Sequence, residues 1–302
     1  MIMHAGIKLR HLRAFAAIAD EGNLSAVARM QGITQPALSR TLAELEDLLG
    51  TPLFRRENRR LILTQQGTLF RRHVHQALQL LDAGAAALRP GTMAGIVRVG
   101  ILPTAATRLF PRVALRLREV APETLLQIET GPHTYLVRLL RDGQIDLMIG
   151  RMPDAGEMAG LAFQHLYEEP VVLVARAGHP LADQPPATLL RQVPVVMPPE
   201  TAIIRRPVNE YLAGLNMIGL RPAFETAALA IGRGILADSD AVWFISRGVV
   251  GAELERGDLI QIPTGVGYLS GAVGLTHRQS GPPVPGLQLL MQLAQDGARD
   301  QA

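Results

Sequence analysis

The chain of 302 residues contains no cysteine, a single lysine and no long apolar run. Without cysteine it cannot form disulfides, thiolate metal sites or a cysteine nucleophile, which fits a reducing compartment. No window approaches the roughly 18 uninterrupted apolar residues that indicate a membrane-spanning helix. The N-terminal stretch MIMHAGIKLRHLRAF lacks the continuous apolar segment of a secretory signal. We therefore expect a cytoplasmic protein with no membrane partner.

Positive charge is concentrated in the first third of the chain. Residues 1–89 hold 12 Lys or Arg against 7 acidic residues, whereas the remainder holds 18 against 20. This distribution indicates a polyanionic partner for the first third alone. The scarcity of lysine beside abundant arginine is interpreted as a genomic composition bias. A hydrophobic content of 48% and a charged content of 19% are typical of a folded protein, and the length suits two or three domains.

Two helices are predicted near the start of the chain. Residues 9–20 place apolar side chains at helical spacing, which favours an amphipathic helix. Ser25 is expected to cap a short second helix. Gly32 occupies a position where a helix ends in the left-handed conformation, and Ile33 is expected to fill the core after it.

A third helix is predicted in TQPALSRTLAELEDLLG, residues 34–50. Thr34 can cap it, and Pro36 lies in the first turn, where its missing N–H does no harm. One stripe of the helix is apolar and buried: Leu38, Leu42, Leu45 and Leu49. The opposite face combines short side chains with Gln35 and Arg40, whose paired hydrogen-bond groups can read base edges in a major groove. This favours a helix-turn-helix over an ordinary amphipathic helix with a solvated face, which is the alternative.

The segment GTPLFRRENRRLILT predicts two short strands joined by a basic turn, a wing beside the third helix. The turn brings together Arg55, Arg56, Arg59 and Arg60. Clustered arginines of this kind suit contacts with DNA phosphates. The alternative is a solvated surface turn.

Residues 15–67 resemble the signature of the LysR-type transcriptional regulators. The motifs that carry the resemblance are Gln-Pro-Ala-Leu-Ser, residues 35–39, and Leu-Gly-x-x-Leu-Phe-x-Arg, residues 49–56. Met30 departs from the leucine common in the family, but methionine can fill the same core position. From the residues and the resemblance together, the predicted DNA-binding residues are Ser25, Thr34, Gln35, Pro36, Ser39, Arg40, Arg55, Arg56 and Arg59.

Residues 65–89 predict one long helix without proline. A helix this exposed usually needs a partner, and in the family the corresponding helix pairs antiparallel with its mate. The resemblance therefore implies a homodimer through residues 65–89 and a homotetramer. His73 and His75 do not share a helix face, so no metal site is expected there.

The Pro- and Gly-containing segment RPGTMAG reads as a hinge, beyond which strands and helices alternate. Alternation of this kind favours a parallel sheet covered on both faces and divided into two α/β lobes. The arrangement resembles the type 2 periplasmic-binding fold, which LysR-type regulators carry as an effector domain. The predicted fold is thus an all-α winged helix-turn-helix followed by a two-lobed α/β effector domain. The expected boundaries are 1–66 for the DNA-binding domain, 67–94 for the linker helix and hinge, 95–165 with 267–302 for lobe I, and 166–266 for lobe II.

Ligands of such sheets lie at the carboxyl ends of the strands, where helix N-termini favour anions. Together with the family resemblance, this rule selects the candidate effector-binding residues Thr104, Pro132, His133, Arg151, Thr201 and Thr226. Arg151 suits a carboxylate or a phosphate, with an interlobe salt bridge as the alternative. For His133 the alternative is a plain helix-capping loop.

Catalytic signatures are missing from the pattern. No Ser/His/Asp elbow, paired-carboxylate site or metal cluster stands out, and GVGYLSGAVG lacks the order of a nucleotide-binding loop. We therefore predict no catalytic residue, cofactor or metal. A solute-binding protein and an enzyme are the competing hypotheses, but the former would carry a secretion signal and lack the N-terminal domain.

The predicted function is a ligand-responsive DNA-binding regulator acting on double-stranded DNA at an interrupted palindrome. Its inducer is expected to be a small anionic or sugar-derived molecule in the interlobe cleft, and RNA polymerase is a further candidate partner. LPTAATRLFP and MAGLAFQHLYEEPVVLVARAGHPL resemble the branch that includes regulators of sugar-binding-protein and protocatechuate genes. That resemblance implies control of carbon-source catabolism or transport.

Overall fold

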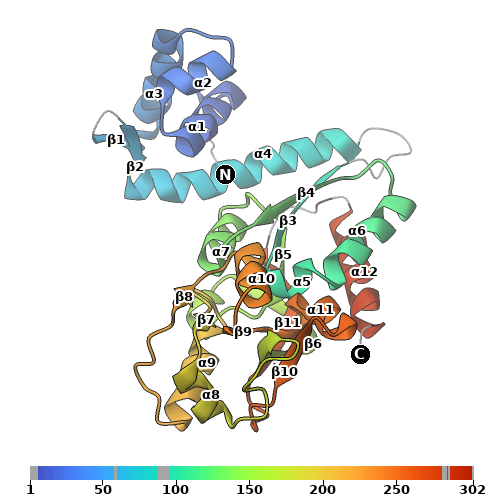
Figure 1. The fold of residues 1–302 in the computed structure, drawn as a ribbon. Helices are drawn as coiled ribbons and strands as arrows, with labels where there is room; N and C mark the ends of the chain where they lie inside the picture. Colours follow the sequence, from blue (N-terminus) through green and yellow to red (C-terminus); the bar gives the residue numbers. More distant parts are fainter. Residues whose placement is uncertain (1–5, 58–59, 88–94, 281–283, 285, 301–302) are drawn as a thin grey trace. The chain divides into compact units, whose positions relative to one another are not determined.

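The computed structural model describes residues 6–57, 60–87, 95–280, 284 and 286–300. Two compact units emerge from the internal contacts, an N-terminal unit up to the hinge and a C-terminal unit beyond it (Figure 1). Arg59 and the hinge segment 88–94, on which predictions were made, lie outside the described residues. In the part of the chain described, no helix is both long and apolar enough to cross a membrane.

The N-terminal unit has the predicted order of three helices, a two-stranded wing and a long helix. Its elements are α1 (Leu9–Glu21), α2 (Leu24–Met30), α3 (Gln35–Leu49), β1 (Phe54–Glu57), β2 (Arg60–Leu63) and α4 (Gln65–Ala87). Phe15 is fully buried at the centre of this unit. Its ring centroid lies 5.4 Å from that of Phe54 and 5.1 Å from that of Phe70, so one aromatic cluster joins α1, the wing and α4.

The start of α2 differs from the prediction. Asn23, not Ser25, caps the helix, because its side-chain oxygen accepts hydrogen bonds from the backbone N–H groups of Ser25 at 2.9 Å and Ala26 at 3.1 Å. Asparagine is as good a capping residue as serine, and the helix begins two positions earlier than expected. Ser25 therefore lies inside the first turn, and its hydroxyl is free for another contact.

The turn between α2 and α3 has the predicted glycine conformation but not the predicted packing. Gly32 has a φ of 66°, in the left-handed region. Met30 and Ile33 were expected in the core, yet they are 71% and 43% exposed. That expectation was wrong because α2 directs Val27 and its neighbour Ala28 inward, which places Met30 away from the core.

The C-terminal unit is built on one long mixed sheet with the strand order β4-β3-β5-β11-β6-β9-β7-β8, and β10 pairs with β6. The strands are β3 (Ile96–Ile101), β4 (Leu125–Thr130), β5 (Leu147–Arg151), β6 (Leu161–Arg176), β7 (Val195–Met197), β8 (Phe224–Glu225), β9 (Val242–Ser246), β10 (Leu259–Ile262) and β11 (Ser270–Arg278). The helices are α5 (Pro103–Ala106), α6 (Leu109–Val120), α7 (His133–Arg141), α8 (Pro186–Gln192), α9 (Arg205–Gly214), α10 (Leu229–Ala237), α11 (Gly251–Arg256) and α12 (Leu287–Arg299), with short 3-10 turns at Ala155–Glu157 and Arg247–Val249.

Lobe I is covered on both faces because side chains alternate along its strands. On β5, Leu147 and Ile149 belong to the core shared with α6 and α12, whereas Met148 belongs to the core shared with α7. Helices α6 and α12 lie side by side in Figure 1. Lobe II has one core around the fully buried Trp243 and Phe244 of β9.

The two lobes are joined by β6, which changes partners along its length. Up to Pro170 it pairs antiparallel with β11, and from Val171 onward it pairs with β9 and β10. The sheet is therefore mixed and not purely parallel as predicted, although β3, β4, β5 and β7, β8, β9 do form parallel pairs. The physical reason is that β6 leaves lobe I while β11 returns to it, so the two crossing strands run in opposite directions.

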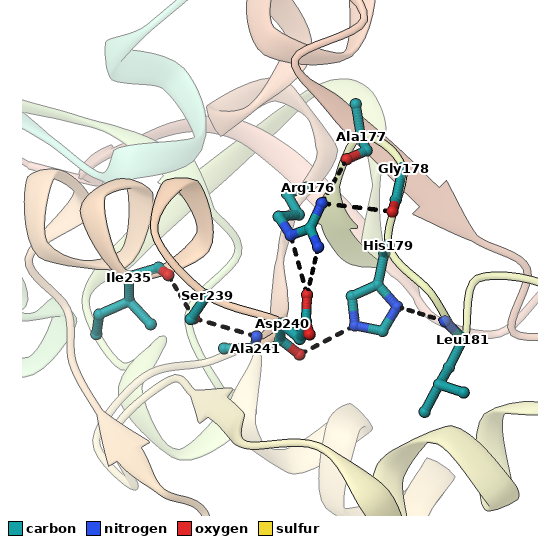
Figure 2. A network of polar contacts seen from close by, with 9 residues as sticks. All are labelled: Arg176, Ala177, Gly178, His179, Leu181, Ile235, Ser239, Asp240 and Ala241. Carbon is teal, nitrogen blue, oxygen red and sulfur yellow. Dashed lines mark hydrogen bonds and ion pairs between the residues drawn. The ribbon is translucent and has the colours of Figure 1, made fainter.

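The turn AGHPLA, residues 177–182, follows β6 and is held by a polar network (Figure 2). Arg176 binds Oδ1 of Asp240 through Nε at 3.0 Å and Nη2 at 2.6 Å, and Nη1 donates to the carbonyl of Ala177 at 3.0 Å. The buried His179 accepts from the N–H of Leu181 at Nδ1. Its Nε2, 3.0 Å from the carbonyl of Asp240, must then carry the proton. The network fixes the turn against the loop before β9.

Candidate functional site

The third helix presents a polar face opposite its leucines. Leu38, Leu42 and Leu45 are buried and Leu49 is half-buried, as predicted. Gln35, Pro36 and Arg40 are exposed, and Ser39 is half-buried. Thr34 caps the helix by accepting from the N–H of Ala37 at 3.4 Å. The first turn of α3 is therefore anchored while its polar side chains remain available.

Ser25 contributes to this face through the second helix. Its hydroxyl donates to the side-chain oxygen of Gln35 at 3.3 Å. Both residues are exposed, so the bond links α2 and α3 at the surface and does not belong to the core. The contact orients the amide of Gln35 and joins two of the predicted DNA-binding residues.

The wing is a two-stranded antiparallel ribbon in which Arg55 pairs with Ile62 and Arg56 with Leu61. Arg55 is 61% exposed and lies 2.5 Å from the carboxylate of Glu57, so part of its charge is balanced locally. Arg56 is also exposed, and no described acidic side chain lies within ion-pair distance of it. Of the four arginines predicted to cluster in the wing, the structure describes Arg55, Arg56 and Arg60. Arg55 and Arg56 differ, because the first has an acidic partner and the second has none among the described residues.

A glutamate that the pattern did not single out fixes the wing to the third helix. One side-chain oxygen of Glu46 accepts from the backbone N–H of Leu53 at 2.7 Å and of Phe54 at 3.1 Å. The N–H of Leu61 donates to the carbonyl of Gly22 at 3.1 Å, which ties the second strand to the end of α1. The helix periodicity places Glu46 beside the buried leucine stripe. That position could have indicated from the sequence that Glu46 has a structural contact.

The six candidate effector residues line a single cavity of about 500 Å³ between the two lobes of the C-terminal unit. They come from separate elements: Thr104 from α5, Pro132 and His133 from the start of α7, Arg151 from the end of β5, Thr201 from the loop after β7 and Thr226 from the loop after β8. The remaining walls are largely apolar and include Ile101, Leu102, Pro103, Pro198, Pro199, Ile203, Ile204, Leu229, Ile245 and Val249.

Arg151 lies at the junction of the lobes. It is 4% exposed, and its Nη2 donates to the carbonyl of Glu169 at 2.9 Å and to the hydroxyl of Ser246 at 3.2 Å. Burial lowers the pKa of Arg151, and the charge of Glu169 acts in the opposite direction. An arginine remains charged under any ordinary condition. The alternative interpretation was an interlobe salt bridge. Among the described residues Arg151 instead makes hydrogen bonds to a carbonyl and a hydroxyl, with no carboxylate oxygen within ion-pair distance, and these bonds use only part of the guanidinium.

The counter-charge of Arg151 is a buried carboxylate. Burial raises the pKa of Glu169, whereas a hydrogen bond from the backbone N–H of Gly248 and the charge of Arg151 lower it. Burial also raises the pKa of the neighbouring Tyr167 to about 12. A carboxylate, a guanidinium and a neutral phenol are thus gathered where β6 passes between the lobes.

His133 begins α7 and is 5% exposed. Its Nδ1 lies 3.3 Å from the carboxylate of Glu157. Burial lowers the pKa of His133, and the charges of Glu157 and Asp154 raise it. The imidazole is therefore more than a capping group, because it faces acidic side chains on one side and lines the cavity.

Three buried polar atoms around the cavity have no hydrogen-bond partner among the described residues. They are Oγ1 of Thr104, Nε2 of His133 and Nε of Arg151. Buried polar groups are nearly always satisfied by protein, water or ligand. Thr104, His133 and Arg151 thus place a hydroxyl, an imidazole and a guanidinium in the cavity wall, while these three atoms themselves are buried.

Ser246 and Glu169 were missed by the sequence analysis. Ser246 ends β9, so the strand-end rule that selected the other residues would have found it. Glu169 lies in the middle of β6, and no local pattern distinguishes it from the exposed Glu168 beside it. The sequence therefore contained enough information to select Ser246 but not Glu169.

Comparisons with known proteins agree with the two-unit organisation. Residues 9–68 match the model of the bacterial regulatory helix-turn-helix protein, lysR family, and residues 90–299 match that of the LysR substrate binding domain. The HTH-type transcriptional regulator PcaQ of Agrobacterium fabrum is 36% identical over 97% of this chain and 95% of its own length. YdcI of Escherichia coli, also an HTH-type transcriptional regulator, is 34% identical over 94% of each chain.

A solved full-length OxyR variant from Pseudomonas aeruginosa shares the fold, with a TM-score of 0.71 at 24% identity over 97% of this chain and 95% of that one. The winged helix-turn-helix, the two-lobed α/β unit with its interlobe cavity, and the matches over both units lead to one conclusion. The chain belongs to the LysR family of bacterial transcriptional regulators and is a DNA-binding regulator, not an enzyme.

Proposed function

We propose that the chain binds operator DNA through α3 and the wing, and that a small carboxylic acid with an apolar body binds in the interlobe cavity and alters that DNA binding. The observation that carries the ligand class is the buried guanidinium of Arg151 in the wall of an otherwise largely apolar cavity. Burying a cation costs hydration free energy, and a carboxylate beside it offsets part of that cost.

On the DNA side, we propose that Gln35 and Arg40 read base edges in a major groove. Arg55, Arg56 and Arg59 would hold phosphates. The short side chains of Ser25, Thr34, Pro36 and Ser39 would allow close approach of α3 to the duplex. The exposure of the first turn of α3 and of Arg56 supports this assignment.

On the ligand side, we propose that Arg151, which lines the cavity, pairs with a carboxylate. Thr104 and His133 would contact one or two hydroxyl or carbonyl oxygens, with Pro132, Thr201 and Thr226 closing the walls. The number of apolar wall residues favours an aromatic or alkyl acid over a sugar derivative, because a sugar would leave several hydroxyls facing aliphatic carbon. A ligand of this class fits control of carbon-source catabolism.

We propose assembly through the long helix. Phe70, Val74 and Leu78 pack into the N-terminal core, whereas Leu69 and Leu81 are 51% and 54% exposed. Two exposed leucines on one helix support a homodimer through residues 65–89, and pairing through the effector domains would extend it to a homotetramer. A dimer would place two recognition helices on an interrupted palindrome. Contact with RNA polymerase completes the proposed set of partners.

The domain boundaries follow the same proposal: 1–66 for DNA binding, 67–94 for the linker, and 95–302 for the effector domain. The family matches at 9–68 and 90–299 support them. The change of partners along β6 between Pro170 and Val171 supports lobe boundaries close to 166 and 266.

Fluorescence anisotropy of the full chain on its own upstream DNA, against scrambled DNA and across a salt series, tests the DNA assignment. Sequence-selective binding with a steep salt dependence is expected. Equal, weak binding to both duplexes would contradict it, unless a randomised-site selection recovers a preferred operator.

The same assay then tests the ligand class by titration of benzoate, protocatechuate and gluconate. We expect a change in affinity for the operator with the two aromatic acids and none with gluconate. Arg151→Met is the matched control and should abolish the response without changing ligand-free DNA binding. A response to gluconate alone would contradict the aromatic acid as the ligand class and indicate a sugar acid instead.

A further inference from the structure

A buried arginine begins α9 behind the wall of the interlobe cavity. Arg205 is the first residue of the helix and is 7% exposed. A cation at a helix N-terminus is opposed by the helix dipole, and its burial costs hydration free energy. This position therefore requires strong compensating contacts.

Those contacts come from four oxygen acceptors. Nη2 lies 2.7 Å from Oε1 of Glu200, and Nη1 lies 2.7 Å from Oε1 of Glu225. Nη1 also donates to the carbonyl of Pro198 at 2.6 Å, and Nε donates to Oδ1 of Asn209 at 3.0 Å. We call these five residues the Arg205 cluster. Planar guanidinium donors suit such a divergent set of acceptors, and the short charge-assisted bonds are the strong kind.

Three of the four partners of Arg205 lie in or beside the two loops that form the lobe II wall of the cavity, and the fourth, Asn209, lies on α9 itself. Pro198 and Glu200 lie in the loop after β7, next to Thr201, and Glu225 ends β8, next to Thr226. Pro198, Thr201 and Thr226 line the cavity. Arg205 is not among the described residues that line it, so the cluster supports the wall from behind.

Backbone pairing between the two segments is short among the described residues. Strands β7 and β8 pair over two residue positions, and the N–H groups of Ala223 and Thr226 donate to the carbonyls of Val195 at 3.0 Å and Met197 at 3.1 Å. The β8 strand is itself the edge of the sheet. Arg205 adds two charged contacts, to Glu200 and Glu225, and a buried bond to the carbonyl of Pro198, and so connects the two loops through side-chain contacts.

We propose that Arg205 is a positioning residue for the effector cavity: it holds Thr201 and Thr226 at their mutual spacing by joining the loops after β7 and β8. The effect on ligand affinity rests on the proposed function of the cavity, whereas the coupling of the two loops does not. Arg205 acts through the two glutamates and touches no ligand.

Amide hydrogen–deuterium exchange of the full chain measures the coupling without any ligand. In Arg205→Met, the amides of residues 200–204 and 225–228 should exchange at least about tenfold faster than in the wild type. The matched control is Arg206→Met, because Arg206 is 79% exposed and, among the described residues, forms its ion pair with Glu210 on its own helix, at 3.0 Å. The control should leave both loops unchanged. Unchanged exchange in Arg205→Met would overturn the proposal.

Single-partner variants distinguish a link between loops from general loss of stability. Glu225→Ala should release residues 225–228 more than 200–204, and Glu200→Ala should do the reverse. Arg205→Lys keeps the charge but cannot reach all acceptors, so intermediate exchange is expected. If every variant instead accelerated exchange uniformly across lobe II, including the strand β9, Arg205 would be an ordinary stabilising residue and the proposal would be wrong.

Calorimetric titration with benzoate and protocatechuate connects the coupling to the cavity. The wild type and Arg206→Met should bind alike, and Arg205→Met should bind at least about tenfold more weakly. If the wild type binds neither acid but the loops respond as expected, the ligand class fails and the coupling stands. If Arg205→Met bound the ligand as tightly as the wild type, Arg205 would not be a positioning residue for the cavity.

Discussion

Arginine serves the two units of the molecule in opposite ways. In the N-terminal unit, Arg40 and Arg56 are exposed, and no described acidic side chain lies within ion-pair distance of them. In the C-terminal unit, Arg151 and Arg205 are 4% and 7% exposed and bind named oxygens of neighbouring elements. An exposed cation attracts a polyanion over a distance set by salt, whereas a buried cation fixes geometry at contact range. The first arrangement suits binding to a duplex, and the second suits a shaped ligand cavity.

The largest expected effect tests whether the units are energetically separate. Leu45→Ala removes a fully buried side chain from the core of the N-terminal unit and should lower its free energy of unfolding by about 2–5 kcal/mol. DNA binding should weaken with it. The single tryptophan, Trp243, is buried in lobe II, so its fluorescence reports the other unit. In a urea titration, circular dichroism should show an earlier transition while the tryptophan transition stays in place; a joint shift would show that the units unfold together.

The next effect concerns the buried arginine of the cavity. Arg151→Met should weaken binding of benzoate by about 10–100-fold, because a charge-assisted bond is worth about 1.5–3 kcal/mol. Isothermal titration calorimetry measures this loss. Arg151→Lys keeps the charge and guards against misfolding of the methionine variant. Ligand binding that survives both substitutions would remove Arg151 from the site.

Arg40→Ala tests the role of an exposed arginine on the third helix. If Arg40 reads a base edge, the change should cost about 1–3 kcal/mol of operator binding and relax sequence preference. Competition binding against operators altered one base pair at a time measures both quantities. Uniform weakening on every sequence would instead identify a phosphate contact.

The wing offers a smaller and more discriminating comparison. Arg56→Ala should reduce the slope of log affinity against log salt by about 0.9, the value for one phosphate contact. Arg55→Ala should change the slope less, because Glu57 already balances that charge at 2.5 Å. Anisotropy across the same salt series measures both variants, and equal slopes would mean that Arg55 leaves Glu57 on binding DNA.

The smallest effect is a pH dependence from His133. Burial lowers its pKa below the ordinary value of 6.5, so the folded state resists a proton that the unfolded chain accepts. The stability from the neutral imidazole is present above pH 6.5 and is lost as pH falls through the folded pKa. The difference in thermal midpoint between the wild type and His133→Gln should therefore shrink on acidification below that value. Because Glu169 has a raised pKa and acts in the opposite direction, only this difference between variants isolates His133; a difference independent of pH would contradict the assignment.

Local patterns predicted the N-terminal unit closely, because its helices are short-range structures with a period that the leucines reveal. The stripe of Leu38, Leu42 and Leu45 and the cap at Thr34 were readable in this way. The errors came where two local solutions compete. Asn23 and Ser25 can both cap α2, and the spacing of apolar residues did not show that Met30 would face solvent.

The sequence by itself determined which elements form and which strand ends carry polar residues, because helix caps, side-chain periodicity and strand-end positions are properties of neighbouring residues. The strand-end rule therefore selected six residues that line one cavity, and their binding of a ligand stays a prediction. Only the tertiary structure decided which groups meet across the chain. Arg151 reaches Ser246, and Arg205 reaches Glu225, through the pairing and crossing of strands distant in sequence. Burial and charge compensation depend on those long-range contacts, so no local pattern could reveal the buried carboxylate of Glu169 or the support behind the cavity wall.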